Sequence, residues 1–258
     1  MFFAPGTQID RADVFPMFGW RHIALLIIVA LCLFLAIHYV AHAPQKQAKR
    51  IIRVAAVAVP VLELSHTVWL YLCGFTDFIK LLPLHLCAMQ SIFIPLAVFT
   101  RKTYFKEFVY ATAVLGGALG ILFPAGVAEC YPVWHYQTIQ TAVLHGLLIF
   151  VPLALIFSGE FRPELRNFSK VLLIFLCVAL VAAAVDFGFG ENYMFLRQAP
   201  EGTPLVWIYD TFGRGTYLVV TFLILASASI SMYWPFTKRG RQIAAQRAVE
   251  RKHNKERV

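Results

Sequence analysis

Long apolar runs, separated by short polar segments, dominate the chain. A helix that crosses a bilayer needs about 20 consecutive, mostly apolar residues. Seven runs are close to that length: residues 20–40, 51–72, 81–100, 105–125, 138–158, 168–187 and 216–235. The pattern predicts an all-α protein in which seven transmembrane helices form a single domain over residues 1–258.

Lys and Arg are distributed unevenly among the connecting segments, which predicts an orientation. They are frequent in the first, third and fifth loops and in a basic tail at residues 238–258, and sparse in the second, fourth and sixth loops. Basic residues concentrate in the cytoplasmic loops of membrane proteins. We therefore expect the N-terminus outside and the C-terminus in the cytoplasm.

Composition narrows the class of protein further. Of the 258 residues, 59% are hydrophobic and 14% are charged, whereas soluble domains carry about 25% charged residues. Basic segments beside the membrane, where anionic lipid head groups attract them, explain the net charge of +9, so nucleic-acid binding is not predicted. We expect a protein of the cell membrane whose partners are membrane lipids. The sequence identifies no protein partner.

Polar side chains inside the predicted helices lie in the middle or outer part of the membrane. Such groups are costly in hydrocarbon unless they face the bundle interior or water. Their similar depth predicts one polar cavity, open toward the outer leaflet; the alternative is that they form hydrogen bonds between helices. The residues concerned are Glu63, His66, His85, Cys87, Gln137, Thr141, His145 and Asp186, with Asp210 and Arg214 just before the last helix.

The longest connection, residues 188–215, is rich in aromatic residues and glycines. It is too apolar for a solvated linker, and tyrosines such as Tyr193 favour the membrane interface. We expect this segment, which also contains Asn192, to fold over the outer mouth of the bundle as a lid-like loop. An interfacial surface loop without a role in chemistry is the alternative.

Two further patterns refine the expectation. Gly116 and Gly120 are four residues apart in the fourth run, a spacing that lets two helices approach closely. The histidines show no His-Glu-x-x-His spacing of the kind that binds zinc. No metal and no other cofactor is therefore predicted.

Several segments resemble the YwaF-like family of bacterial integral membrane proteins. They are Leu-Leu-Pro-Leu-His-Leu-Cys at residues 81–87, the glycine-rich stretch at 116–124, Gln140 to His145, and Gly-Glu-Asn-Tyr-Met-Phe-Leu at 190–196. The resemblance implies a bacterial inner-membrane protein. Animal relatives of that family look like intramembrane acyltransferases that move a fatty acyl chain onto an ether phospholipid, using a cysteine on the third span and a histidine on the fifth.

The family histidine corresponds to His145, whereas the family cysteine falls on Leu84. Cys87 lies one turn further along and is our candidate for the missing thiol. His85 and Cys87 are about 200° apart around a helix, so they are not expected to act as a tight pair.

Three functions remain open at this point. The first is a lipid acyltransferase or lipid ester hydrolase, with Cys87 as nucleophile, His145 as general base and His85 beside them. The second is a transporter or binder of a small solute, and the third is a non-catalytic membrane partner of another protein. The predicted substrate-binding residues are Glu63, His66, Gln137, Thr141, Asp186, Asn192, Tyr193, Asp210 and Arg214.

Overall fold

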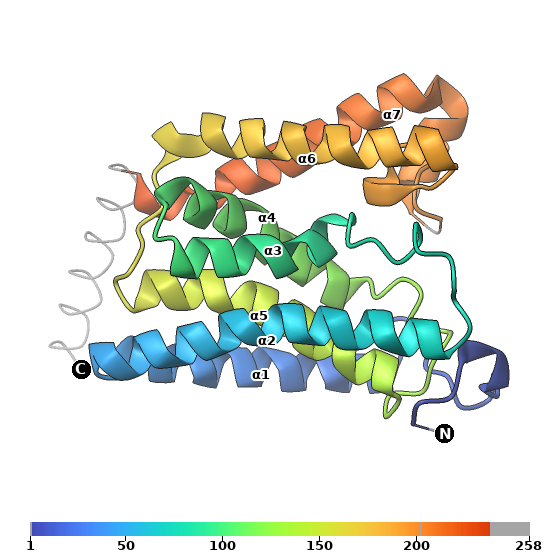
Figure 1. Ribbon diagram of the computed structural model, residues 1–258, viewed down its shortest axis with the longest axis horizontal. Coiled ribbons are helices and arrows are strands. Elements are labelled where there is room, and N and C mark those ends of the chain that lie inside the picture. The colour runs from blue at the N-terminus through green and yellow to red at the C-terminus, as the bar shows by residue number, and fades with distance from the viewer. Residues whose placement is uncertain (1, 202, 238–258) are drawn as a thin grey trace, which may run out of the picture.

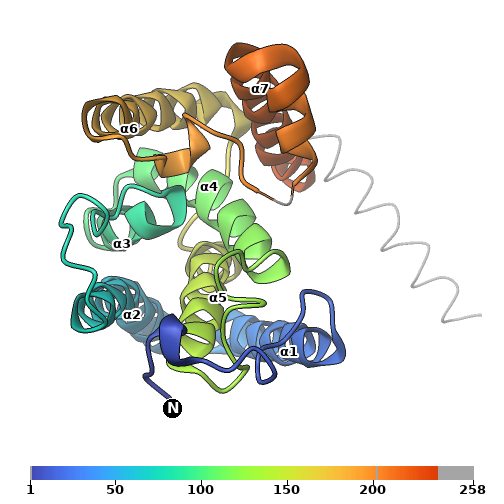
Figure 2. The same cartoon turned by 90° about the vertical axis from the view of Figure 1, so that its right-hand side faces the viewer.

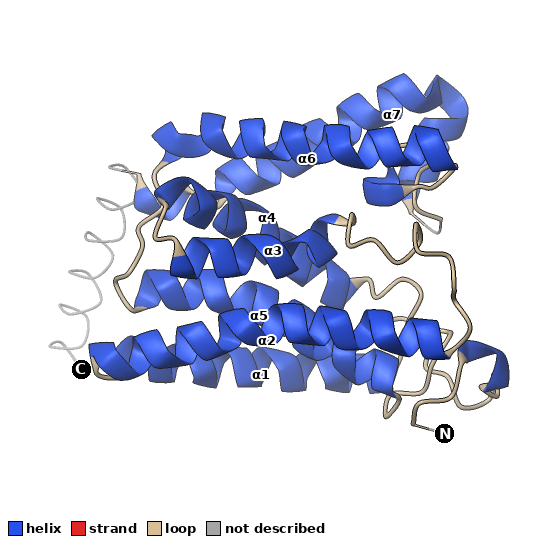
Figure 3. Cartoon of the chain, viewed as in Figure 1, coloured by secondary structure: helices blue, strands red, loops and turns tan. Residues whose placement is uncertain are grey.

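A computed structural model of the chain describes residues 2–201 and 203–237, and over these ranges every regular element is helical (Figures 1 and 3). The all-α prediction is confirmed for this part of the chain. The predicted basic tail, residues 238–258, lies outside the described residues. The α-helices are α1 (Trp20–His42), α2 (Gln45–Leu72), α3 (Leu86–Phe99), α4 (Thr103–Leu122), α5 (Tyr136–Phe157), α6 (Phe168–Phe189) and α7 (Pro204–Ser231). Short 3-10 helices are η1 (Gly6–Gln8), η2 (Leu165–Asn167), η3 (Tyr193–Phe195) and η4 (Trp234–Phe236).

Six of these helices are long and apolar enough to cross a membrane, and α3 is the exception. Its 14 residues extend about 21 Å, less than the roughly 30 Å of hydrocarbon in a bilayer. The helix begins at Leu86 and not at residue 81, because Pro83 keeps the residue before it out of the α conformation. His85 then has an extended backbone, with φ −69° and ψ 144°, at the N-cap. The predicted third span is therefore shorter than expected. Six of the seven predicted spans correspond to helices that are long and apolar enough to cross a membrane.

The centre of the bundle is formed by α4 and α5 (Figure 2). Half of the apolar segment of α4 and 56% of that of α5 are buried, against 6% for α1 and 11% for α7. The helices α2 and α3 lie on one side of this pair, and α1 packs against α5 from the other side. Helices α6 and α7 contact α4 at the end of the pair away from α5. Exposed aliphatic and aromatic side chains cover the outer helices. Such an exterior suits lipid as the solvent.

The connection between α6 and α7 is shorter than the sequence indicated. Helix α6 ends at Phe189, where Gly190 adopts a left-handed conformation with φ 84°. Helix α7 already begins at Pro204 and contains a break at Gly213, with φ 79° and ψ 169°. In the described part of the chain, the predicted lid-like loop at 188–215 therefore reduces to residues 190–201 and 203. These fold back onto the bundle, since the Tyr193 hydroxyl donates to the Ile79 carbonyl and the Tyr217 hydroxyl to the Phe195 carbonyl.

At one end of the bundle, called here the N-terminal end, the first residues of the chain lie across α2 and α5 (Figure 1). The Trp69 indole donates to the Phe3 carbonyl at 3.1 Å, and His135 Nε2 donates to the Ala4 carbonyl at 3.0 Å. The loops at 73–85, 123–135 and 190–201 lie at the same end. The N-terminal segment is thus fixed to the helices by its own carbonyl groups.

The opposite end, called here the basic end, is held together around the buried side chain of Glu107, near the start of α4. One carboxylate oxygen accepts from the Glu164 amide at 3.0 Å and from Asn167 Nδ2 at 3.1 Å. The other accepts from the Tyr233 hydroxyl at 3.0 Å. A single carboxylate therefore joins α4, the α5–α6 connection and the segment after α7. Phe2 and Tyr233 lie at opposite ends of the bundle. Which of these ends faces the cytoplasm stays a prediction.

Candidate functional site

One face of α4 carries three glycines, and Cys87 and His145 approach this face from two different helices. A β-carbon placed on Gly116 would lie 3.3 Å from the Cys87 Sγ of α3. A β-carbon on Gly120 would overlap with the imidazole of His145 on α5. The absence of side chains at these two positions is therefore what gives the thiol and the imidazole room.

The hydrogen bond of His145 determines which ring nitrogen is basic. Its Nδ1 lies 2.9 Å from the Thr141 carbonyl, one turn earlier in α5. A carbonyl can only accept, so Nδ1 carries the proton and Nε2 keeps its lone pair. Nε2 is also one of the atoms beside Gly120, so the basic nitrogen points toward the glycine face.

The distance between the thiol and the imidazole can be bounded. The β-positions of residues four apart on a helix are about 5–6 Å from each other. With Cys87 Sγ 3.3 Å from the β-position of Gly116 and Nε2 in contact with that of Gly120, the sulfur and Nε2 lie within roughly 12 Å. They are not hydrogen-bonded to each other in the described structure.

Polar residues of α2 and of the first turns of α5 meet on one side of the thiol of Cys87 and the imidazole of His145. The Gln137 side-chain amide donates to His66 Nε2 at 3.1 Å, and the Gln137 carbonyl oxygen is buried with no donor among the described residues. Among the described residues no group forms a hydrogen bond or ion pair with the Glu63 carboxylate.

Asp186 and His85 form a separate group at the N-terminal end. Asp186 is fully buried, and its Oδ1 accepts from the Tyr193 amide at 2.6 Å, whereas Oδ2 has no donor among the described residues. The His85 ring packs against Tyr193 at 5.1 Å and Phe195 at 5.7 Å between centroids. Burial and the nearby charge of Glu191 raise the pKa of Tyr193 to about 12, so its hydroxyl stays protonated and acts as a donor.

The predicted site residues fall into two groups, because His85 packs against Tyr193 and Phe195 whereas Cys87 lies beside Gly116. Asn192 belongs to the loop itself: its side-chain oxygen accepts from the amides of Arg197 and Gln198. Asp210 and Arg214 are exposed on α7, and the Arg214 guanidinium lies 5.0 Å from the Phe187 ring centroid. These last two residues are not brought into the group of polar residues around α4.

Sequence reasoning missed a buried pair beside Cys87. Gln90 is one turn after Cys87 on α3, and its side-chain amide donates to Thr112 Oγ1 of α4 at 3.0 Å. The Gln90 carbonyl oxygen is buried and has no donor in the described part of the chain. The sequence could have indicated this pair, because Gln90 is a polar amide within an apolar run. It follows Cys87 by three residues and therefore lies on the same helix face.

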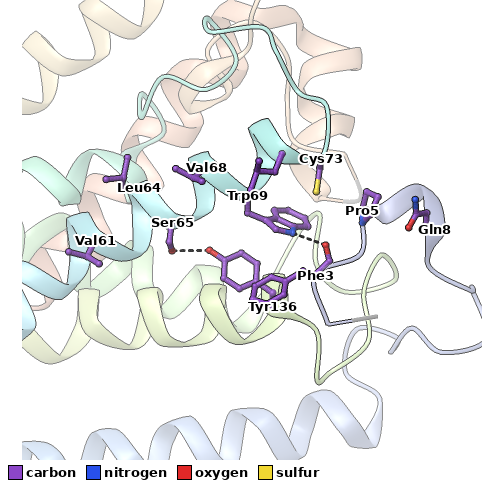
Figure 4. Close-up of a pocket in the computed structure, with 11 residues that line it drawn as sticks. Phe3, Pro5, Gln8, Val61, Leu64, Ser65, Val68, Trp69, Cys73 and Tyr136 are labelled. Carbon is purple, nitrogen blue, oxygen red and sulfur yellow. Dashed lines mark hydrogen bonds between the residues drawn. The ribbon is translucent and has the colours of Figure 1, made fainter.

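A groove of about 1030 Å³ lies at the N-terminal end, between the first residues and α2 (Figure 4). Val61, Leu64 and Val68 of α2 form its apolar wall, and Ser65 Oγ is bonded to the Tyr136 hydroxyl at 2.8 Å on its floor. None of the predicted site residues lines it. The groove and the Cys87–His145 region are therefore different features. Within the described residues there is also no group of three or more His, Cys, Asp or Glu side chains that could hold a metal ion.

Fold and site together define a polytopic, all-helical membrane protein with polar groups between its central helices. Comparison with family models then gives a match to the TMEM164 family over residues 17–234, which is most of the chain. The chain belongs to the TMEM164 family, a family of membrane proteins. No curated protein and no solved structure matched it.

Proposed function

We propose that the protein is an intramembrane enzyme that transfers or hydrolyses lipid acyl esters, with Cys87 as nucleophile and His145 as general base. The observation that carries the proposal is the glycine face of α4, which admits Cys87 Sγ beside Gly116 and His145 Nε2 beside Gly120. Thiol and imidazole are the usual pair for acyl transfer through a covalent intermediate. The resemblance to the YwaF-like family and its acyltransferase relatives supports the same chemistry and a location in the bacterial cell membrane.

The reaction balances with these two groups alone. His145 Nε2 takes the thiol proton, and the thiolate attacks the ester carbonyl of a donor lipid. The C–S bond forms, the ester C–O bond breaks, and the leaving alkoxide takes the proton from the imidazolium. An acceptor hydroxyl, from a lysolipid or from water, then gives its proton to Nε2 and attacks the thioester, so that a C–O bond forms and the C–S bond breaks. The thiolate finally recovers the proton.

Leu84 stands where the related enzymes have their cysteine, and Cys87 replaces it in this proposal. Leu84 packs against the hydrophobic core and carries no reactive group. Cys87 also borders the core but faces Gly116. The polar side chains of Glu63, His66 and Gln137 would contact the glycerol or head group of the donor lipid, and residues 190–201 would cover the site.

The test is a search for an acyl group on Cys87. The full chain is reconstituted in nanodiscs with a phospholipid and a lysolipid, and its mass is measured before and after hydroxylamine, which cleaves thioesters. We expect an acyl adduct in the wild type, none in C87A, and little acyl exchange in H145A. C177A is the matched control, because Cys177 is exposed on α6. Full acyl exchange in both C87A and H145A would sink the mechanism.

A second function is favoured by one observation, the unpaired carboxylate of Glu63 in the membrane-spanning part of α2. Ionisable residues inside a membrane are rare and often mark solute or proton pathways. In this alternative the protein binds a small cationic or hydrogen-bonding solute between α2 and α5. Solute-dependent thermal stabilisation of the wild type that disappears in E63Q would select it over acyl transfer, and unchanged stabilisation in E63Q would exclude Glu63 from the solute site.

A further inference from the structure

A second pocket, of about 440 Å³, lies at the basic end, far from the Cys87–His145 region. It is enclosed by the first turn of α4, the α5–α6 connection and the first turn of α6. Four basic and two acidic side chains line it: Lys106, Arg162, Arg166, Lys170, Glu160 and Glu164. Its lining is therefore polar and carries more positive than negative charge.

The two acidic side chains are already engaged by cations. Glu160 is 3.0 Å from Lys49 Nζ, and Glu164 is 2.6 Å from Arg166 Nε. Burial alone would raise the pKa of Glu160, but the bonds from Lys49 and Gln45 hold it below its usual value. Both carboxylates are thus paired with cations, and they do not cancel the charge of the remaining basic residues.

The remaining cations are available to a ligand. Within the described residues Arg162 makes no hydrogen bond and no ion pair. Lys106 Nζ donates to the Glu160 carbonyl at 3.1 Å, and Lys170 Nζ to Asn167 Oδ1 at 3.3 Å. Each ammonium group has further N–H donors beyond these single bonds. A tetrahedral anion in the pocket would find one guanidinium and two ammonium groups around it.

The pocket is preorganised by the buried carboxylate of Glu107. That carboxylate fixes the Glu164 amide and the Asn167 side chain, and Asn167 in turn orients Lys170. The α5–α6 connection is thus held in place before any ligand binds, which reduces the entropy lost on binding. The positive end of the α4 dipole lies at the same place, since Thr103 and Lys106 of the first turn line the pocket.

Exposed apolar side chains lie directly beside the pocket and indicate that the anion is part of a lipid. Leu165, on the connection that lines it, is 44% exposed, and Leu173, on the same face of α6 as Lys170, is 61% exposed. Leu180 continues this face two turns further along. A phosphate in the pocket with acyl chains along α6 would satisfy both surfaces.

We infer that this pocket binds the phosphate of an anionic phospholipid at the basic end of the bundle. Such basic pockets between transmembrane helices are suited to lipid head groups. This inference does not depend on the acyl-transfer proposal, because the pocket shares no residue with the Cys87–His145 region.

The test measures binding of short-chain lipids to the detergent-purified full chain by native mass spectrometry. The probes are dioctanoyl phosphatidylglycerol, dioctanoyl phosphatidylcholine and inorganic phosphate. The pocket variant is R162Q/K170Q. The matched control is R50Q/R53Q, which removes the same charge from exposed positions on α2 near the same end. All four positions are exposed, so both variants should remain folded, and unchanged melting temperatures check this.

We expect the wild type to bind phosphatidylglycerol more tightly than phosphatidylcholine. Loss of two charge-assisted contacts should weaken phosphatidylglycerol binding about tenfold or more in R162Q/K170Q, whereas R50Q/R53Q should bind like the wild type. Equal losses in both variants would show that only the general positive charge matters, and no loss in R162Q/K170Q would remove the site; either result overturns the inference. Inorganic phosphate that binds as tightly as the lipid would assign the pocket to free phosphate and would likewise overturn the lipid assignment.

Discussion

At the scale of single residues, Gly120 controls the position of the His145 ring. A methyl group at this position would overlap with the imidazole, so the ring must rotate away from the glycine face. We expect G120A to lower acyl exchange at least tenfold while the protein remains folded, because a displaced base loses its proton-transfer geometry. The measurement is acyl exchange in nanodiscs, alongside the circular dichroism spectrum.

The control for this substitution is G146A. Gly146 is adjacent to His145 in α5, but a methyl group there would meet only Val29 Cγ1 at 3.9 Å, an ordinary contact. G146A should therefore retain exchange. If G120A and G146A behave alike, the position of the ring does not limit the reaction.

His135 makes the capping of the first turn of α5 dependent on pH. Its Nδ1 accepts from the backbone amide of Gln137 at 3.1 Å, and its Nε2 donates to the Ala4 carbonyl at 3.0 Å. Only the first bond requires the neutral ring, because a protonated ring still donates from Nε2 but can no longer accept at Nδ1. Burial lowers the pKa of His135, opposed by the bond to Ala4. A lowered pKa means that the neutral ring stabilises the fold above the unfolded value of 6.5, and that this stabilisation is lost as the pH falls through the lower folded value.

We therefore expect the backbone amide of Gln137 to exchange hydrogen faster as the solution is acidified, after correction for the intrinsic pH dependence of exchange. In H135Q this additional acid sensitivity should be absent. The Trp69 and Tyr131 rings, at 5.8 and 4.5 Å from the His135 ring, carry no charge at these pH values and leave His135 as the titrating group. Identical acid profiles for H135Q and the wild type would assign the response to another residue.

At the scale of helices, Gly117 sets how closely α4 approaches α5. A β-carbon at this position would lie 2.8 Å from the His145 carbonyl oxygen, 2.8 Å from Ile149 Cγ1 and 3.2 Å from Leu148 Cβ. Backbone atoms and a β-carbon cannot move aside as a flexible side chain can. G117A should therefore destabilise the protein by about 1–3 kcal/mol, the usual cost of overpacking.

Thermal unfolding in detergent measures this effect. G188A serves as the comparison, because a β-carbon on Gly188 of α6 would meet no atom within 4 Å and alanine favours a helix over glycine. Its melting temperature should equal or exceed that of the wild type. A melting temperature of G117A as high as that of G188A would mean that α4 and α5 separate at little cost.

The positions of the helices could be predicted from the sequence, whereas their mutual rotations could not. Apolar length alone located six spans, since lipid requires it of each helix separately. The late start of α3 was signalled by Pro83, whose effect on the preceding residue is local. Asp186 accepts a hydrogen bond from Tyr193 and does not lie beside Cys87. This arrangement depends on how α6 and α3 are rotated about their axes in the bundle. The glycine pattern of α4 predicted close packing but not which side chains would use the space.

At the scale of the whole molecule, Glu107 connects the elements of the basic end. In E107A the Glu164 amide, the Asn167 side chain and the Tyr233 hydroxyl would all lose their acceptor. Since a buried donor left without a partner is costly, we expect E107A to lower the free energy of unfolding by about 3–5 kcal/mol.

Y233F provides the graded comparison for equilibrium unfolding. It removes only the donor of one of the three bonds and should cost about 1–2 kcal/mol. Because the same carboxylate shapes the lipid-phosphate pocket, E107A should also weaken phosphatidylglycerol binding. Equal losses of stability in E107A and Y233F would reduce the role of Glu107 to its single bond with Tyr233.

The burial of α4 also bears on the order in which the chain enters the membrane during synthesis. This helix is the least apolar of the six candidate spans, and half of its apolar segment contacts other helices instead of lipid. The translocon selects helices by their apolarity, one after another, yet the main partner of α4 is α5, which is made later. A nascent chain halted after α4 should therefore insert this helix inefficiently in microsomes, as read by glycosylation sites placed beyond it. A chain extended through α5 should insert both helices as a hairpin, because packing against α5 then stabilises α4 in the membrane where its own apolarity is insufficient.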